Sequence, residues 1–295
     1  MKRVILLAVA AAMICGCEKE IVSDSTSVKT AGTTAADAVK TKKFTFTLKG
    51  DFSDEWKPVT RGYLSADGKD MTDVWVLDYD ADGHLLQQLH QSDNTAEDFG
   101  KPVMNLAYGV HQVYFIASRG VSPVLDTEAH TLTFGSVRDT FWKRYDVSVV
   151  ATSNGNRAVT LDRVVTKLRL TFTDEVPATL SKLTIAADTW HSGINALTGV
   201  PTAAAARIST INVPALYIGT TGQLAASIFG ICGDDYTTDV SVTASNANSQ
   251  AIASVALEDV PMKKNTTTSY SGPLFTRQPT FTMTLSSLGI CITLL

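Results

Sequence analysis

The chain has 295 residues, a formal net charge of −4 and a hydrophobic content of 44%, which suits one large or two small globular domains. A mildly acidic chain without a block of basic residues has no electrostatic basis for binding nucleic acid, and we exclude that class of partner.

The first 16 residues predict a lipoprotein signal peptide. Lys2 and Arg3 form a positive start, and Val4–Ile14 is an apolar run, shorter than the roughly 20 residues that a membrane-spanning helix needs. The run ends in Ile14-Cys-Gly-Cys17, which matches the lipobox of bacterial lipoproteins. We therefore expect Cys17 to become the acylated N-terminus and the outer-membrane lipid to be its partner. The alternative is an ordinary secretory signal that ends in a cysteine by chance.

Residues 17–42 are predicted to form a flexible tether. The segment is rich in Ser, Thr, Ala, Lys and Asp and lacks aromatic residues, so it cannot bury enough apolar surface to offset its chain entropy. Its Glu18-Lys-Glu20 start is either a surface-export signal of the kind seen in Bacteroidetes lipoproteins or ordinary tether charge.

Short alternating segments follow from Lys43 to the end of the chain. In Phe44-Thr-Phe-Thr-Leu48 the apolar side chains share one face, as in a half-buried strand. No long apolar stripe at helical spacing occurs, and about a dozen such strands at intervals of 8–12 residues predict an all-β protein with two β-sandwiches. We place the two domains at 43–160 and 161–295. The further strands that we expect are 74–79, 84–90, 110–117, 130–134, 145–151, 158–165, 164–173, 179–186, 208–218, 223–231, 239–243, 251–257 and 280–285.

One acidic stretch, Asp78-Tyr-Asp-Ala-Asp-Gly-His84, fits two structures. Asp78, Asp80 and Asp82 followed by Gly83 match the start of a calcium loop, but position 12 of that loop is Leu89 instead of the closing glutamate. The flanking segments are predicted strands, and Asp-Gly is a favoured two-residue hairpin turn. A hairpin tip with solvated carboxylates is the simpler prediction, and a weak loop-bound cation is the alternative.

Other chemical motifs are missing from the sequence. The five histidines show no zinc-ligand spacing, and there is no nucleophile elbow or phosphate-binding glycine loop. We expect no catalysis and no cofactor. Cys232 and Cys291 are the two cysteines left for the folded part; two buried thiols are the simpler prediction and one disulfide the alternative.

Aromatic residues lie in or beside the predicted strands, and core packing is their expected role. A carbohydrate-stacking platform is the alternative. The residues concerned are Trp75, Tyr114, Phe115, Phe141 and Trp142.

Four segments in order resemble the fimbrillins of Bacteroidales type V pili. Residues 70–79 (DMTDVWVLDY) resemble the opening strand of the family, with its DY before a turn, and residues 108–117 (YGVHQVYFIA) its glycine-led central strand. Residues 161–170 (LDRVVTKLRL) resemble the strand L-x-R-x-x-A-K-[LV], with Thr166 in place of alanine. Residues 260–272 (VPMKKNTTTSYSG) resemble a late P-x-x-x-N-x-x-T hairpin.

The resemblance implies two transthyretin-like Greek-key β-sandwiches in tandem and a structural role at the cell surface. The expected protein is a lipid-anchored subunit of an outer-membrane fimbrium, most similar to the FimB-type anchor, or otherwise an accessory subunit. It would assemble with other fimbrial subunits by β-strand complementation and support adhesion to a host or bacterial receptor. The alternative is a surface lipoprotein that binds glycans or host proteins.

The family also implies a processing step. Stalk subunits release their first strand by cleavage after an arginine, and Arg61 follows the predicted strand 44–48 here. Arg61 is thus a candidate cleavage site, although an anchor subunit would keep its first strand and a plain loop arginine is the alternative. The uncharged C-terminal segment 286–295 departs from the polar last strand of the family.

Overall fold

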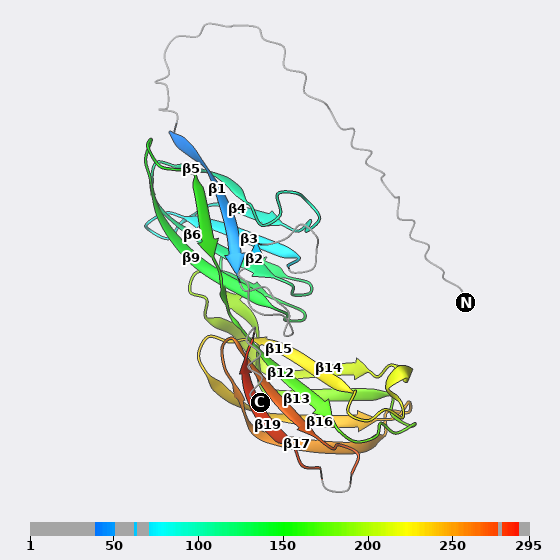
Figure 1. Cartoon of the computed structure of the whole chain (residues 1–295). Helices are drawn as coiled ribbons and strands as arrows, with labels where there is room; N and C mark the ends of the chain where they lie inside the picture. The colour runs from blue at the N-terminus through cyan, green and yellow to red at the C-terminus, as the bar shows by residue number, and fades with distance from the viewer. Residues whose placement is uncertain (1–38, 51–61, 64–70, 277–278, 289–295) are drawn as a thin grey trace, which may run out of the picture. The chain divides into compact units, whose positions relative to one another are not determined.

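The computed structural model describes residues 39–50, 62–63, 71–276 and 279–288 (Figure 1). The signal peptide, Cys17, nearly all of the tether, Arg61 and Cys291 lie outside these residues, and what we predicted for them stays a prediction. No helix in the described part of the chain is long and apolar enough to cross a membrane.

The prediction of an all-β protein is confirmed. The described residues form strands in four sheets, and their only helix is a single turn of 3-10 helix, η1 (Ala215–Tyr217). The sheets pack face to face as β-sandwiches, because strands with alternating apolar residues bury one face each.

The first sandwich consists of two sheets. Its strands are β1 (Thr41–Gly50), β2 (Gly62–Tyr63), β3 (Asp73–Tyr79), β4 (Leu85–Gln91), β5 (Val103–Ala107), β6 (Gly109–Ser118), β9 (Thr140–Val149), β10 (Asn156–Thr160) and β11 (Asp162–Arg163). One sheet has the order β10-β1-β2, with β5 also paired to β1, and the other has the order β11-β9-β6-β3-β4. Phe44 and Phe46 of β1 meet Val74, Val76 and Phe115 in the core between the sheets.

The second sandwich also has two sheets. Its strands are β12 (Val165–Phe172), β13 (Lys182–Asn195), β14 (Pro201–Asn212), β15 (Ala225–Ile231), β16 (Tyr236–Ser245), β17 (Ala251–Met262), β18 (Thr266–Gly272) and β19 (Thr282–Ser287). The sheet order β15-β12-β18-β19 packs on the strands β17, β16 and β13, with β14 paired to β13. Leu168, Leu170 and Phe172 of β12 are fully buried in the core between them.

A hairpin from the first half of the sequence joins a sheet of the second half. Strands β7 (Val124–Asp126) and β8 (Thr131–Thr133) pair with each other, and β8 pairs with the end of β13. Tyr79 of β3 is 1% exposed, and its hydroxyl lies 3.0 Å from Nδ1 of His130 beside this hairpin. The hairpin thus packs on the outer face of β3. The domain division at residues 160 and 161 stays a prediction.

Both sandwiches pair their first strand in parallel with a late strand. β1 pairs with β10, and β12 pairs with β18. The next neighbour on the other side is antiparallel in each case, β5 for β1 and β15 for β12. The two sandwiches differ at the late strand, because β19 pairs with the outer edge of β18 (Figure 1), whereas no described strand covers that edge of β10.

The predicted strands differ from the observed ones in several details, among them the bounds of β9 (Thr140–Val149) and the unpredicted strand β7 (Val124–Asp126). The strand predicted at 208–218 ends at Asn212, since Pro214 has no N–H to donate to a ladder and η1 follows it. Strands β5 and β18 were not predicted as strands, because one is only five residues long and the other is a run of threonine, serine, tyrosine and glycine with little apolar alternation.

Candidate functional site

The first strand, β1, lies inside its sheet rather than at an edge. Residues 45–49 pair in parallel with residues 156–160 of β10, and residues 41–45 pair with residues 103–107 of β5 on the other side. Backbone bonds continue past the end of β5, where the N–H of Phe46 donates to Pro102 (3.0 Å) and that of Leu48 to Gly100 (3.0 Å). Both edges of β1 are therefore paired with protein.

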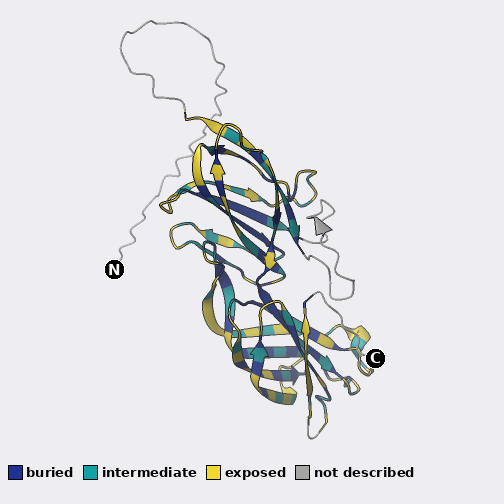
Figure 2. Ribbon diagram, turned by 60° about the vertical axis from the view of Figure 1, so that its left-hand side comes forward, coloured by how far each residue is buried: buried dark blue, intermediate teal, exposed yellow. Residues whose placement is uncertain are grey.

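The side chains of β1 fill a large part of the first core. Phe44, Phe46 and Leu48 are each 0% exposed, and Figure 2 shows the buried positions of the sandwich in dark blue. The ring of Phe46 lies 5.0 Å from that of Phe115 and 6.0 Å from that of Tyr145. Burying three such side chains stabilises the sandwich by roughly 5–9 kcal/mol. Without β1, the sheet would have an apolar groove between two unpaired strands.

The last strand, β19, differs from β1 because its side chains are exposed to solvent. All six of its residues are exposed, including Met283 and Leu285 at 43% each, although the strand pairs with β18 over its full length. Backbone hydrogen bonds, and not buried side chains, attach it to the sheet. Its outer edge carries N–H and C=O groups that no described strand pairs.

Arg163 fixes the end of β19 to the rest of the chain. Its Nε and Nη2 donate to the two carboxylate oxygens of Asp139 (2.8 and 3.0 Å), and its Nη1 donates to the carbonyl of Leu288 (2.7 Å) and to Oδ1 of Asn265 (3.2 Å). The guanidinium also lies 4.8 Å from the ring centre of Phe141. Arg163 is the arginine of the segment 161–170 that resembles the fimbrillin pattern, and its role is structural.

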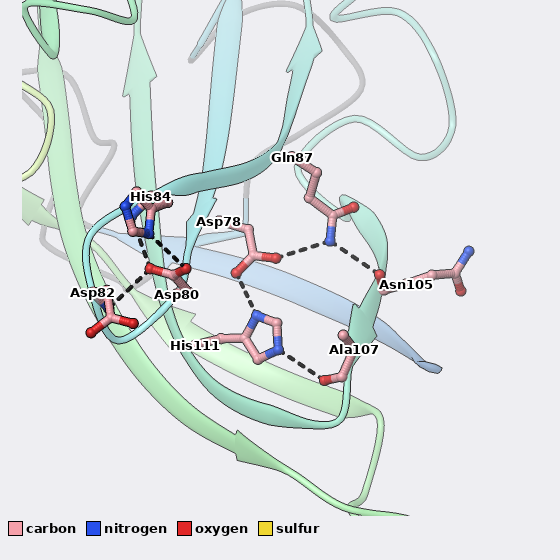
Figure 3. A network of polar contacts seen from close by, with 8 residues as sticks. All are labelled: Asp78, Asp80, Asp82, His84, Gln87, Asn105, Ala107 and His111. Carbon is pink, nitrogen blue, oxygen red and sulfur yellow. Dashed lines mark hydrogen bonds and ion pairs between the residues drawn. The ribbon is translucent and has the colours of Figure 1, made fainter. Parts of the chain in front are cut away.

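The acidic stretch forms a hairpin tip, as predicted, but the turn is longer than two residues (Figure 3). β3 ends at Tyr79 and β4 begins at Leu85. The Asp80 carboxylate accepts the backbone N–H of Asp82 (2.9 Å) and of His84 (2.8 Å) and lies 3.1 Å from Nδ1 of His84. The pKa of Asp80 is lowered, mainly by the hydrogen bond that its carboxylate accepts from the backbone N–H of His84. Gly83 has φ +86°, a conformation that suits glycine.

Asp78 belongs to a different environment from the other two aspartates. It is 0% exposed and continues the inward-facing positions of Val74 and Val76. Its carboxylate accepts a hydrogen bond from Nε2 of Gln87 (2.9 Å) and lies 2.8 Å from Nδ1 of His111, whose Nε2 lies 2.8 Å from the carbonyl of Ala107 (Figure 3). His111 and Asp78 thus form a buried hydrogen-bonded pair that joins β6 to β3.

The structure brings together only part of the candidate metal site. Asp80, Asp82 and His84 each place one ligand atom within 4.8 Å of the others, whereas the Asp78 carboxylate is bound to His111 and Gln87. Leu89, at the position of the closing glutamate, lies in β4. A weak loop-bound cation stays the untested alternative to a plain hairpin tip.

Of the five aromatic residues proposed as a stacking platform, four are buried and Trp142 is partly buried. Trp75 is 5% exposed and its ring stacks on His90 at 4.2 Å between ring centres, while Trp142 donates its Nε1–H to the carbonyl of Ala196 (2.7 Å). Tyr114 is 3% exposed. These contacts support the core-packing role and leave no flat exposed ring among the five.

Three titratable groups of the second sandwich, one buried and two partly buried, have shifted pKa values. Cys232 is a free thiol, and burial, followed by the charge of Asp235, raises its pKa to about 12. Burial also raises the pKa of Tyr236 and lowers that of His191, whose ring lies 5.0 Å from the Tyr236 ring at nearly a right angle. Each shift disfavours the charged form, as expected for groups packed against apolar surface.

Fold and site together define an all-β protein of β-sandwiches in which the first strand is a buried, paired part of its sheet. Residues 122–287, more than half of the chain, match the sequence profile described as "Family of unknown function (DUF6562)". The chain therefore belongs to this family.

Solved structures from Bacteroidales share the fold. A proposed adhesin from Bacteroides ovatus superposes with a TM-score of 0.53 at 13% identity, covering 82% of this chain and 94% of that one. A second proposed adhesin from Bacteroides ovatus has a TM-score of 0.51 at 10% identity, covering 84% and 88%. A fimbrial assembly protein from Parabacteroides distasonis has a TM-score of 0.50 at 9% identity, covering 84% and 100%. At these identities the likeness shows the fold, and no curated protein matches the sequence.

Proposed function

We propose that this protein is a structural subunit of a cell-surface fimbrium that joins its neighbours by β-strand complementation and supports adhesion. The observation that carries the proposal is the position of β1, which is paired on both sides and buries Phe44, Phe46 and Leu48. The shared fold with an adhesin and a fimbrial assembly protein agrees with it.

Strand complementation needs a groove and a strand that fits it. The groove is the space that β1 occupies, where a strand from another subunit would find the free edges of β10 and β5 and pockets for three apolar side chains. The chain also has a donor candidate in β19, which lies exposed at the end of a sheet and alternates Met283 and Leu285 with threonine and serine.

The proposed place of the subunit is the base of the fimbrium or an accessory position. Acylation of Cys17 would hold it in the outer membrane, and an anchor of this kind would keep β1. If the chain is instead processed after Arg61, β1 would leave together with the lipid. We propose no catalytic activity, and the proposed partners are other fimbrial subunits and a surface receptor.

Exchange of β1 can be tested in the purified protein. A specific protease site inserted between residues 50 and 62 allows the connection to be cut, after which a labelled peptide of residues 41–50 is added. The proposal expects slow uptake of the peptide and release of the original strand. A peptide with Phe46→Ala is the matched control and should be taken up far less. Equal uptake of both peptides, or none of either, would contradict complementation through this groove.

The anchor role is tested in cells. A deletion strain should show shortened, detached or absent fimbriae in electron micrographs, and a Cys17→Ser variant should lose both its fatty-acid label and its membrane fractionation. Cys232→Ser is the matched control, since Cys232 is buried and should not carry lipid. Fimbriae of normal length and attachment in the deletion strain would rule out the anchor role.

A further inference from the structure

A cleft of about 440 Å³ lies beside the second sandwich, away from β1 and β19. It is lined by residues 136–138, residues 207–211 of β14 and residues 227–229 of β15. β14 and β15 are edge strands of two different sheets that approach each other (Figure 1). Residues of both strands line the cleft. Its volume falls within the range of about 300–1,000 Å³ that small-molecule sites occupy. We call it the arginine cleft.

Two arginines, Arg138 and Arg207, line the arginine cleft, and no acidic residue is among its lining residues. In the part of the chain that the structure describes, Arg138 has no carboxylate partner, and the hydrogen bond of Arg207 is to the neutral hydroxyl of Ser209 (Nε to Oγ, 3.3 Å). The nearest acid in sequence, Asp139, already accepts two hydrogen bonds from Arg163. Among the described residues, no carboxylate pairs with either guanidinium group.

The two positive charges also interact with each other. Burial, and then the charge of Arg138, lower the pKa of Arg207. Like charges at close range cost free energy unless an anion lies between them. A planar guanidinium presents paired N–H groups that match the oxygen atoms of a carboxylate, sulfate or phosphate.

The rest of the lining suits a hydroxyl-rich ligand. Ser136, Ser209, Thr210 and Ser227 are among the lining residues, and a hydroxyl group can both donate and accept a hydrogen bond. Ile208 is 72% exposed and offers an apolar contact on the same wall. A sugar ring has both kinds of surface, with hydroxyl groups around its rim and C–H groups on its faces.

We propose that the arginine cleft binds an acidic saccharide, with its carboxylate, sulfate or phosphate group between Arg138 and Arg207. This site is separate from the assembly strands and does not depend on the fimbrial proposal. Neither arginine stood out as a site residue in the sequence, because they are 69 positions apart and match no binding motif.

The test is isothermal titration calorimetry on the purified chain with three acidic sugars: a glucuronate-containing disaccharide, glucose 6-sulfate and glucose 6-phosphate. A neutral disaccharide and inorganic sulfate serve as comparisons. At least one acidic sugar should bind about tenfold or more tightly than the neutral one, and added sodium chloride should weaken it. Binding of inorganic sulfate as tightly as every acidic sugar would overturn the assignment to saccharides.

Arginine variants test whether the acidic sugar binds in the arginine cleft. The double variant Arg138→Gln/Arg207→Gln should lower the affinity for the acidic sugar by about 10- to 100-fold or more, because two charge-assisted contacts are lost. Arg144→Gln, an arginine of the first sandwich paired with Asp146, is the matched control and should bind like the original chain. If the double variant fails to fold, the exposed Arg138→Gln alone should still weaken binding. Unchanged affinity in a folded arginine variant would overturn the proposal, whatever the outcome for fimbriae.

Discussion

Replacing Asp78 with alanine should destabilise the protein strongly. The change removes a carboxylate that is 0% exposed and that faces Nδ1 of His111 at 2.8 Å and accepts from Nε2 of Gln87 at 2.9 Å. Removing one partner of a buried hydrogen bond costs about 1–3 kcal/mol, because the other partner stays buried without a hydrogen bond. Gln87 loses less, since its amide also donates to the carbonyl of Asn105 (3.0 Å).

A double-mutant cycle separates the interaction energy of Asp78 and His111 from the loss of packing. Asp78→Ala, His111→Ala and the double variant are compared by urea unfolding at neutral pH. Because the double variant leaves neither Asp78 nor His111 buried without its partner, its cost should fall below the sum of the single costs by about 0.5–3 kcal/mol. Asp82→Ala, at the exposed tip of the same hairpin, is the control and should cost little. A cost below about 1 kcal/mol for Asp78→Ala, or strictly additive costs, would refute the buried pair.

Four further predictions concern the core, two buried groups and the hairpin. Phe46→Ala should cost about 3–5 kcal/mol in urea unfolding, against almost nothing for Leu86→Ala, which is 49% exposed; similar losses would contradict the central place of β1 in the core. His191 has its folded pKa lowered by burial, so the unfolded chain binds the proton more readily and stability should fall as the pH drops through the ordinary histidine value of 6.5. His191→Leu should flatten that part of the stability–pH curve, and an unchanged curve would argue against the shift. In a chain whose other cysteines are serine, Cys232 should resist a thiol reagent at about pH 8 until the protein unfolds, since burial raises its pKa to about 12; fast reaction of the native protein would count against it. Millimolar calcium should leave the melting temperature unchanged, because the Asp80 carboxylate already accepts hydrogen bonds from the backbone of the turn. A rise in melting temperature that Asp82→Asn abolishes would instead support calcium binding by this loop.

The sequence by itself determined the fold class and most of the strands. Alternation in segments such as Phe44–Leu48 has only one physical outcome, because a period of two places every apolar side chain on the same face of a strand. The hairpin at Asp80–His84 was also predictable, since strands on both sides and a glycine with freedom for positive φ leave little choice. The length of its turn was not, because that depends on where the ladder of β3 and β4 stops.

The tertiary structure alone decided which polar residues matter. Asp78 and Asp80 are two positions apart, yet one is buried against His111 from another strand and the other is held by its own turn. Arg163 holds the end of β19 through hydrogen bonds to Asp139 and Leu288, which lie 24 and 125 positions away in the sequence. Arg138 and Arg207 line one cleft because the segment before β9 lies beside the edge strand β14. Contacts of this kind depend on strand order and sheet packing, and local periodicity contains no information about either.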